Sequence, residues 1–166
     1  MPETSPTLRA SDAHASGPAA EAYEIREIAA ADCRPLRIGI LRPGLDPVRS
    51  VYPLDDLPDT YHLGGFVAGR LCPIASFSPE VQPDDPRPGQ WRLRGMVTRP
   101  ELRGGGLGSA VVRAGIEEAQ RRGGHTMWLH GRVAAMEFYR RLGFVAVGEV
   151  FDTPGTGPHF RMVRPL

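Results

Sequence analysis

Residues 97–108 read V-T-R-P-E-L-R-G-G-G-L-G, and this stretch decides how the rest of the chain is interpreted. Before it, residues 91–98 alternate apolar and polar side chains as a strand does. After it, apolar residues recur at helical spacing from Leu107 to Ala119. The order is therefore strand, glycine loop, helix. Unpaired backbone N–H groups and the positive end of a helix dipole converge at such a junction, which predicts an anion site.

The glycines of this loop suit a phosphate group. Glycine at positions 104, 105, 106 and 108 leaves the amides open to an anion, and Arg103 adds a cation at the rim. A pyrophosphate is the predicted ligand, and a turn that only connects strand to helix is the alternative. A dinucleotide site of the Rossmann type is the weaker phosphate hypothesis, because its glycine spacing and its acidic residue about 20 positions onward are missing.

Working outward, short apolar runs alternate with Gly- and Pro-rich connectors, and we find no internal repeat. Asp32 is predicted as the N-cap of the first helix, and residues 43–59 as a long loop or one short helical turn. The pattern predicts a mixed α/β layer with helices packed on a sheet. The predicted elements are strand 23–28, helix 32–41, strands 61–66, 71–77 and 91–98, helix 107–122, strand 126–130, helix 133–142, and strands 144–149 and 159–163.

The amino-acid composition excludes two kinds of functional site. The chain has 166 residues, enough for one domain, and contains neither Lys nor Asn. The missing lysine excludes a Walker phosphate loop and a pyridoxal Schiff base. Residues 1–20 are predicted to be a flexible leader, and residues 21–166 the folded domain.

Several features predict a cytoplasmic protein without metal. Cys33 and Cys72 stand alone, without metal-ligand spacing, as free thiols do in a reducing compartment. No secretory signal or membrane-length apolar run is found, so we expect no membrane partner. Residues 91–166 hold 12 Arg against 6 acids, which places an anionic ligand there. The excess is too dispersed for nucleic acid.

A second motif stands downstream of the glycine loop. Residues 97–108 resemble the R/Q-x-x-G-x-G/A acyl-CoA motif of the GNAT N-acetyltransferase superfamily. Residues 132–144, R-V-A-A-M-E-F-Y-R-R-L-G-F, are similar to that family's N-x-x-A-x-x-F-Y-x-x-x-G-F segment. The resemblance covers residues 23–166. It implies a single-domain α/β fold with a GNAT-like mixed, mostly antiparallel central sheet and helices packed on both faces.

The resemblance also implies acetyl-CoA as co-substrate, with no metal. Main-chain groups of Met96, Val97 and Thr98 would bind the pantetheine arm, beside a strand bulge that Gly95 itself favours. Arg132 replaces the family's Asn and would reach a CoA phosphate or a main-chain carbonyl. The pyrophosphate would lie on the amides of Arg103, Gly104, Gly105, Gly106, Leu107, Gly108 and Ser109.

Catalysis of amine acylation needs a general base, carbonyl polarisation and a general acid. Tyr139 matches the family's general-acid tyrosine, with a core aromatic as the alternative. His62, on a strand expected to face the cleft, is the candidate base, with a structural histidine as the alternative. His159 is a further candidate for the acceptor pocket, with a purely structural histidine as the alternative. The acids of the 43–59 loop would suit a cationic amine, or form a solvated surface.

The resemblance thus implies an acyl-CoA-dependent N-acyltransferase that moves an acetyl group to a primary amine directly, in a ternary complex. The acceptor would be a small-molecule or peptide amine, selected by residues 43–59 and 151–159. A homodimer is common among the proteins it resembles. Two alternatives stay open: a non-catalytic acyl-CoA sensor or interaction module on the same fold, and a nucleotide-binding oxidoreductase.

Overall fold

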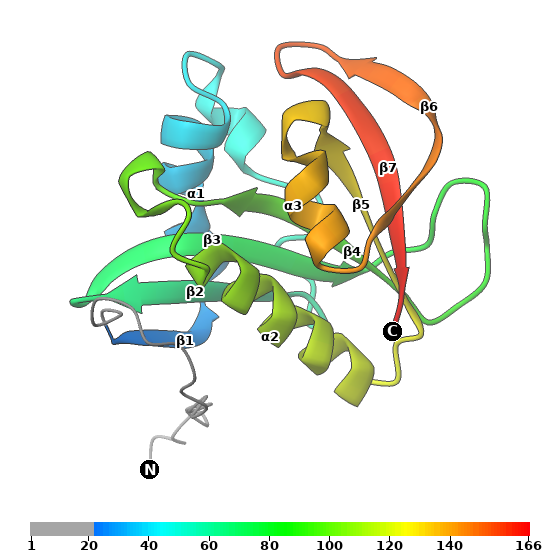
Figure 1. Cartoon of the computed structure of the whole chain (residues 1–166), viewed down its shortest axis with the longest axis horizontal. Helices are drawn as coiled ribbons and strands as arrows, with labels where there is room; N and C mark the ends of the chain where they lie inside the picture. Colours follow the sequence, from blue (N-terminus) through cyan, green and yellow to red (C-terminus); the bar gives the residue numbers. More distant parts are fainter. Residues whose placement is uncertain (1–21) are drawn as a thin grey trace.

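Within residues 22–166, seven strands form a single sheet in the order β1-β2-β3-β4-β5-β7-β6 (Figure 1). The computed structural model describes residues 22–166, so the leader predicted for residues 1–20 lies outside the described residues. The elements are β1 (Tyr23–Ile28), α1 (Ala30–Leu36), η1 (Arg37–Leu41), η2 (Pro47–Ser50), β2 (Tyr61–Val67), β3 (Arg70–Pro79), β4 (Gln90–Val97), η3 (Pro100–Leu102), α2 (Leu107–Arg121), β5 (Thr126–Arg132), η4 (Val133–Ala135), α3 (Met136–Arg141), β6 (Val145–Thr153) and β7 (Gly157–Pro165).

Helices cover both faces of this sheet. The strands pair antiparallel except β4 and β5, which are parallel and joined by α2 as a crossover helix. Helices α2 and α3 lie on one face, whereas α1 and its π-helical continuation η1 lie on the other (Figure 1). The predicted α/β class, with a mostly antiparallel sheet between helices, is confirmed.

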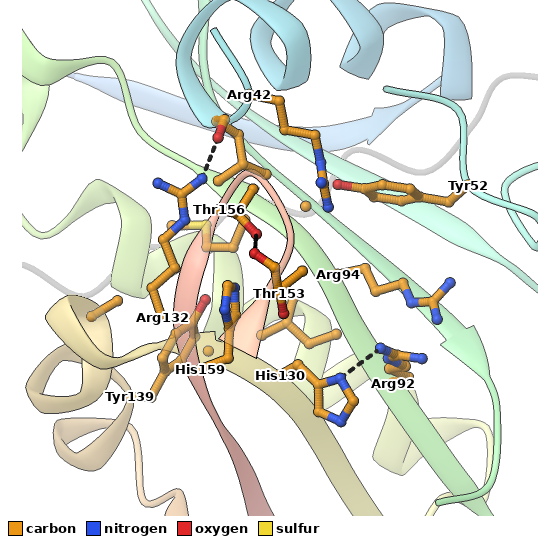
Figure 2. Close-up of a pocket in the computed structure, with 16 residues that line it drawn as sticks. Arg42, Tyr52, Arg92, Arg94, His130, Arg132, Tyr139, Thr153, Thr156 and His159 are labelled. Carbon is orange, nitrogen blue, oxygen red and sulfur yellow. Dashed lines mark hydrogen bonds between the residues drawn. The ribbon is translucent and has the colours of Figure 1, made fainter. Parts of the chain in front are cut away.

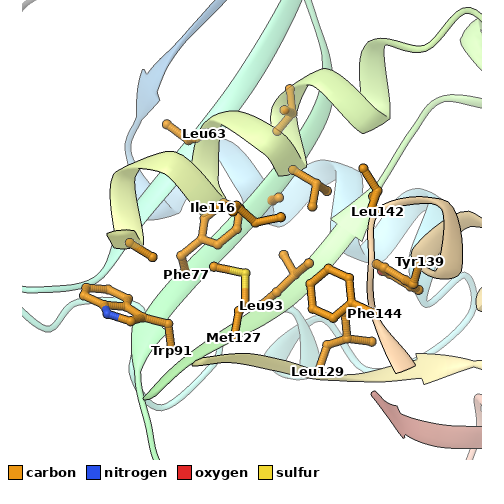
Figure 3. Close-up of a cluster of buried hydrophobic side chains, with 14 of the residues drawn as sticks. Leu63, Phe77, Trp91, Leu93, Ile116, Met127, Leu129, Tyr139, Leu142 and Phe144 are labelled. Atoms are coloured by element: carbon orange, nitrogen blue, oxygen red, sulfur yellow. The ribbon is translucent and has the colours of Figure 1, made fainter. Parts of the chain in front are cut away.

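The larger hydrophobic core fills the space between α2, α3 and the sheet (Figure 3). The helical spacing that predicted α2 places Val111, Val112 and Ile116 on this face. Gly115 lies so close to the sheet that a Cβ there would come within 1.9 Å of the Phe77 ring. The sequence therefore permits α2 to pack directly onto β3.

One helix boundary was predicted wrongly. Asp32 is not the N-cap: the helix begins at Ala30 with Ala29 as N-cap, and the Asp32 carboxylate accepts a hydrogen bond from the Ala29 amide at 3.0 Å. The backbone of Ala29 is extended, as an N-cap requires. The aspartate thus caps the helix from the third position, because its side chain reaches back to an amide left free at the helix start.

Two bulges bend the central strands. Between the pairs Ile74↔Val97 and Ser76↔Arg94, β4 contains one more residue than β3, and Gly95 there has φ +60°. The bulge expected at Gly95 is therefore confirmed. A second register shift falls on β3 around Pro73, which matches the bulge that a proline inside a strand predicts.

Candidate active site

The parallel pair β4 and β5 separates partway along its length. Their pairing runs from Gln90↔Thr126 to Leu93↔Leu129 and then stops, although both strands continue. The β4 segment after Leu93 still pairs with β3 on its other side. Its edge toward β5 is consequently free, which leaves an opening in the middle of the sheet.

A cavity of about 350 Å³ occupies this opening (Figure 2). Its walls come from four separate parts of the chain: the end of η1 with the loop that follows, the separated ends of β4 and β5, the start of α3, and the β6–β7 hairpin. The lining residues are Leu41, Arg42, Tyr52, Arg92, Leu93, Arg94, Gly95, Met96, His130, Gly131, Arg132, Ala135, Tyr139, Thr153, Thr156 and His159.

Tyr139 reaches the cavity from α3. Its ring packs edge-on against Phe138 and Phe144, and it lies over Gly131, where a Cβ would come within 3.2 Å of the ring. Burial, with a smaller contribution from Tyr52, raises the pKa of Tyr139 above its usual value. The phenol therefore stays protonated at neutral pH, as a general acid requires.

His159 lies on β7 and lines the same cavity. Its Nδ1 is 2.7 Å from the carbonyl oxygen of Gly157. A carbonyl can only accept, so Nδ1 carries the hydrogen, and Nε2 of the neutral ring keeps its lone pair. Phe151 stacks on the imidazole and fixes its plane. The prediction that His159 contributes to the pocket agrees with this position.

His62 does not line the cavity. It lies on β2, which β3 separates from β4, and both ring nitrogens are engaged. Nε2 donates to the carbonyl of Asp55 at 3.0 Å, so Nδ1 accepts from the Ser76 hydroxyl at 2.7 Å. The expectation that the hairpin strand would present His62 to the cleft is wrong, because this side chain belongs to a buried polar network behind the cavity wall.

Arg37 is the centre of that network. Its side chain is fully buried and donates to Asp55 at 2.6 and 2.9 Å, to the Ser50 carbonyl at 2.8 Å and to Ser76 at 2.7 Å. Burial alone would raise the pKa of Asp55, but the hydrogen bonds from Arg37 and from the Tyr52 amide outweigh it and hold the pKa below its usual value. The carboxylate stays ionised.

The aspartates of the 43–59 loop, considered above as partners for a cationic amine, do not line the cavity. Asp55 is paired with Arg37, and Asp46 accepts a hydrogen bond from the Val48 amide at the start of η2. Asp56 and Asp59 are exposed away from the cavity. The loop reaches the cavity instead through Tyr52, whose ring lies 4.0 Å from the Arg37 guanidinium.

The glycine loop lies where predicted, between β4 and α2. Gly104 and Gly106 have φ of +84° and +80°, conformations that other residues rarely adopt. No amide from Gly104 to Ser109 donates to a group in the described part of the chain. The surroundings of Gly104, Gly105 and Gly106 are open. An anion could therefore approach several aligned N–H groups.

Two arginines flank the predicted CoA-binding groups. Arg103 is exposed at the loop and donates through Nε to the Thr98 carbonyl at 3.1 Å. Met96 lines the cavity. Its side chain and that of Thr98 lie against Gly108, where an added Cβ would come within 2.9 Å of both. Arg132 donates to the carbonyl of Leu41, the main-chain alternative named for it above.

The cavity has a cationic wall, formed by Arg42, Arg92 and Arg94 together with the predicted Arg132. The arginine excess of residues 91–166 indicated an anionic ligand in this half of the chain, but the sequence interpretation did not name Arg42, Arg92 or Arg94. A second signal was present: Arg92 and Arg94 alternate with apolar residues on a strand that is central in the sheet. Charged side chains on one face of a central strand indicate that this face borders a site and not a core. No local pattern marked Arg42.

Three further findings concern metal ions, membrane spans and cysteines. Within residues 22–166, no group of three or more His, Cys, Asp or Glu side chains is arranged to hold a metal ion. None of the helices in that range is long and apolar enough to cross a membrane. Cys33 and Cys72 are both buried free thiols.

The sheet opens between its two parallel strands, and a glycine loop begins the crossover helix that joins them. The model of the Acetyltransferase (GNAT) family matches residues 24–144. The Bacillus subtilis (strain 168) protein YitI, described as an uncharacterized N-acetyltransferase, is 34% identical over 143 residues, which cover 86% of this chain and 96% of YitI. The chain belongs to the GNAT acetyltransferase family.

Solved structures share this architecture. Escherichia coli ElaA superposes with a TM-score of 0.70 at 20% identity, covering 86% of this chain and 99% of ElaA. The structure of yncA from Salmonella typhimurium, determined with its cofactor acetyl-CoA, gives a TM-score of 0.65 at 22% identity, covering 87% and 94%. At these identities the likeness establishes the fold.

Proposed function

We propose that this protein transfers the acetyl group of acetyl-CoA to a primary amine, directly and in a ternary complex. The observation that carries the proposal is the position of Tyr139 and His159 in one cavity at the opening between β4 and β5. An acid and a base that share a cavity can serve the two proton transfers that aminolysis of a thioester needs.

The residues present fit acetyl-CoA. The pyrophosphate would lie on the unpaired amides from Gly104 to Ser109, with Arg103 at the rim. The free edge of β4 at Met96 and Val97 offers main-chain groups to the pantetheine arm. Arg132, at the end of β5, donates to the Leu41 carbonyl and lines the same cavity. When bound, acetyl-CoA supplies an activated carbonyl with a thiolate leaving group.

His159 is the proposed general base. The amine nitrogen attacks the thioester carbonyl, its proton goes to Nε2 of His159, the C–S bond breaks, and the departing sulfur takes a proton from the Tyr139 hydroxyl. The products are an amide and free CoA, and transfer of one proton from His159 to the Tyr139 phenolate through solvent restores both side chains. The hydrogen bond from Nδ1 to Gly157 fixes the tautomer in which Nε2 can accept. His62 is left out of this scheme, because both its nitrogens are engaged away from the cavity.

Calorimetric titration with acetyl-CoA, CoA and NAD, followed by thiol release with a panel of amines, tests the proposal. Acetyl-CoA binding together with amine-dependent thiol release supports it. Acetyl-CoA binding without release on any amine would favour a non-catalytic sensor. Binding of NAD in preference to CoA would contradict the proposal.

A further inference from the structure

The positive charge of the cavity wall limits which class of amine can be the acceptor. Resting on the proposed function, we propose that the acceptor amine carries an anionic group, a carboxylate or a phosphate, and that Arg42, assisted by Arg94, binds it. The occupant is thus a zwitterionic or anionic small molecule and not a polyamine or another purely cationic amine.

Positive charge in the cavity is not balanced by protein acids. Four arginines line it, and among residues 22–166 no Asp or Glu does. Glu80, just outside, is shared: it lies 2.7 Å from Arg92 and 3.4 Å from Arg94. One carboxylate therefore serves two guanidinium groups, which leaves donors of Arg94 for a ligand.

The positive charge of Arg42 is balanced even less than that of Arg94. It makes no ion pair with any group in the described residues, and its buried Nε has no hydrogen-bond partner there. Figure 2 shows its side chain extending from the end of η1 to the hydroxyl end of Tyr52, with Arg94 below the ring, and each guanidinium lies 5.9 Å from the ring centroid. A partly buried guanidinium without a counter-charge is unfavourable in the free protein, and an anionic ligand would compensate it.

The surroundings also disfavour a second positive charge. Burial, and then the charges of Arg92 and Arg94, lower the pKa of His130 to about 4, so this imidazole stays neutral. An ammonium group entering the same cavity experiences the same repulsion. An acceptor anchored by an anionic group would therefore have its amine shifted toward the neutral, nucleophilic form.

The size and the polar groups of the site fit such a molecule. A volume of about 350 Å³ is at the small end for ligand pockets and accommodates an amino-acid-sized acceptor. The guanidinium groups of Arg42 and Arg94 lie on the side of η1 and β4, whereas His159 and Tyr139 come from β7 and α3 (Figure 2). An anion at the arginines would leave the amine free to point toward the base.

Non-reacting anions test the site without turnover. With CoA saturating, N-acetylglycine probes for a carboxylate, inorganic phosphate for a phosphate, and N-acetylglycinamide serves as the neutral match. We expect at least one anion to bind, Arg42→Gln to weaken it about 100-fold, and Arg42→Lys to retain part of the affinity. Arg113→Gln, which removes an exposed arginine of α2 outside this cavity, should have no effect. Absence of binding by both anions, or equal binding in Arg42→Gln, would overturn the proposal.

A second experiment compares the rates at which different amines are acetylated. Amino acids are compared with their amides, ethanolamine phosphate with ethanolamine, and both sets with putrescine. The anionic members should have the higher kcat/KM, and Arg42→Gln should abolish that preference while the KM for acetyl-CoA stays unchanged. Preference for putrescine, or loss of acetyl-CoA affinity with the anion preference intact, would contradict the assignment of Arg42. If no amine releases thiol although anions still bind through Arg42, the proposed function fails and the anion site stands.

Discussion

Arg37 and Asp55 form a two-point ion pair, at 2.6 and 2.9 Å, between side chains that solvent scarcely reaches. The pair ties η1 to the loop that follows it. Tyr52 stacks on the same guanidinium and forms part of the cavity wall. The Gly95 bulge permits this arrangement, because a Cβ there would come within 2.9 Å of Arg37 and 3.0 Å of Tyr52.

Removing the charge of Asp55 should destabilise the protein strongly. Asp55→Asn leaves Arg37 buried without a counter-charge, and we expect the free energy of unfolding to fall by about 3–5 kcal/mol. Chemical denaturation measures this loss. Asp84→Asn is the matched control, because Asp84 pairs with Arg161 at the surface and its loss should change the free energy of unfolding little. Equal losses in the two variants would contradict the structural role given to Arg37.

The same pair predicts how stability depends on pH. The pKa of Asp55 lies below its ordinary value of 3.8 in the folded protein, because hydrogen bonds from Arg37 and Tyr52 outweigh the opposing effect of burial. A carboxyl with a depressed folded pKa contributes stability above its unfolded pKa and loses it as pH falls through the folded value. Between about pH 5 and 2 the wild type should therefore lose stability more steeply than Asp55→Asn. If the free energy of unfolding fell equally with pH in the two proteins, Asp55 would not be the source of the pH dependence.

Tyr139→Phe isolates the proposed general acid. The variant keeps the ring that packs on Phe144 and Gly131 and removes only the hydroxyl. We expect kcat to fall about 100-fold, with the Kd of acetyl-CoA unchanged by calorimetry. Tyr23→Phe, at an exposed position on the edge strand, is the control. A loss of acetyl-CoA affinity in place of kcat would assign Tyr139 to binding.

Gly105→Val tests the glycine loop without distorting it. Gly106→Val should also weaken acetyl-CoA binding, but φ of +80° at Gly106 would strain the backbone as well. Gly105 has no such φ, and its nearest neighbour is 3.9 Å from a Cβ. We expect Gly105→Val to raise the Kd of acetyl-CoA at least about tenfold with an unchanged melting temperature. An unchanged Kd would mean that the loop is only a turn.

The sequence predicted most of the fold, because periodicity and glycine placement act locally. The alternation around Trp91, the helical spacing after Leu107 and the turn before Arg70 each specify an element from neighbouring residues alone. The Asp32 cap was misplaced by three positions for the same reason, since a capping aspartate serves equally well at the N-cap or at the third helical position.

The site was harder to predict, because its side chains converge from distant segments. Tyr139 could be found through a motif, whereas Arg42 and Tyr52 lie in stretches without one. His62 was misjudged because strand order in the sheet cannot be read from periodicity, and β3 lies between β2 and the opening. Two signals pointed to the cationic wall: the arginine excess of residues 91–166, and the alternation of Arg92 and Arg94 with apolar residues on a central strand.

The separation of β4 from β5 divides the site between unrelated stretches of chain. The glycine loop belongs to the crossover between the two strands, whereas Arg42, Tyr52 and the β6–β7 hairpin belong to connections elsewhere. Substitutions in those outer connections can reshape one half of the site while the other half keeps its sequence. A library confined to Arg42, Tyr52, Thr153 and Thr156 would therefore vary the cavity wall while the glycine loop keeps its sequence.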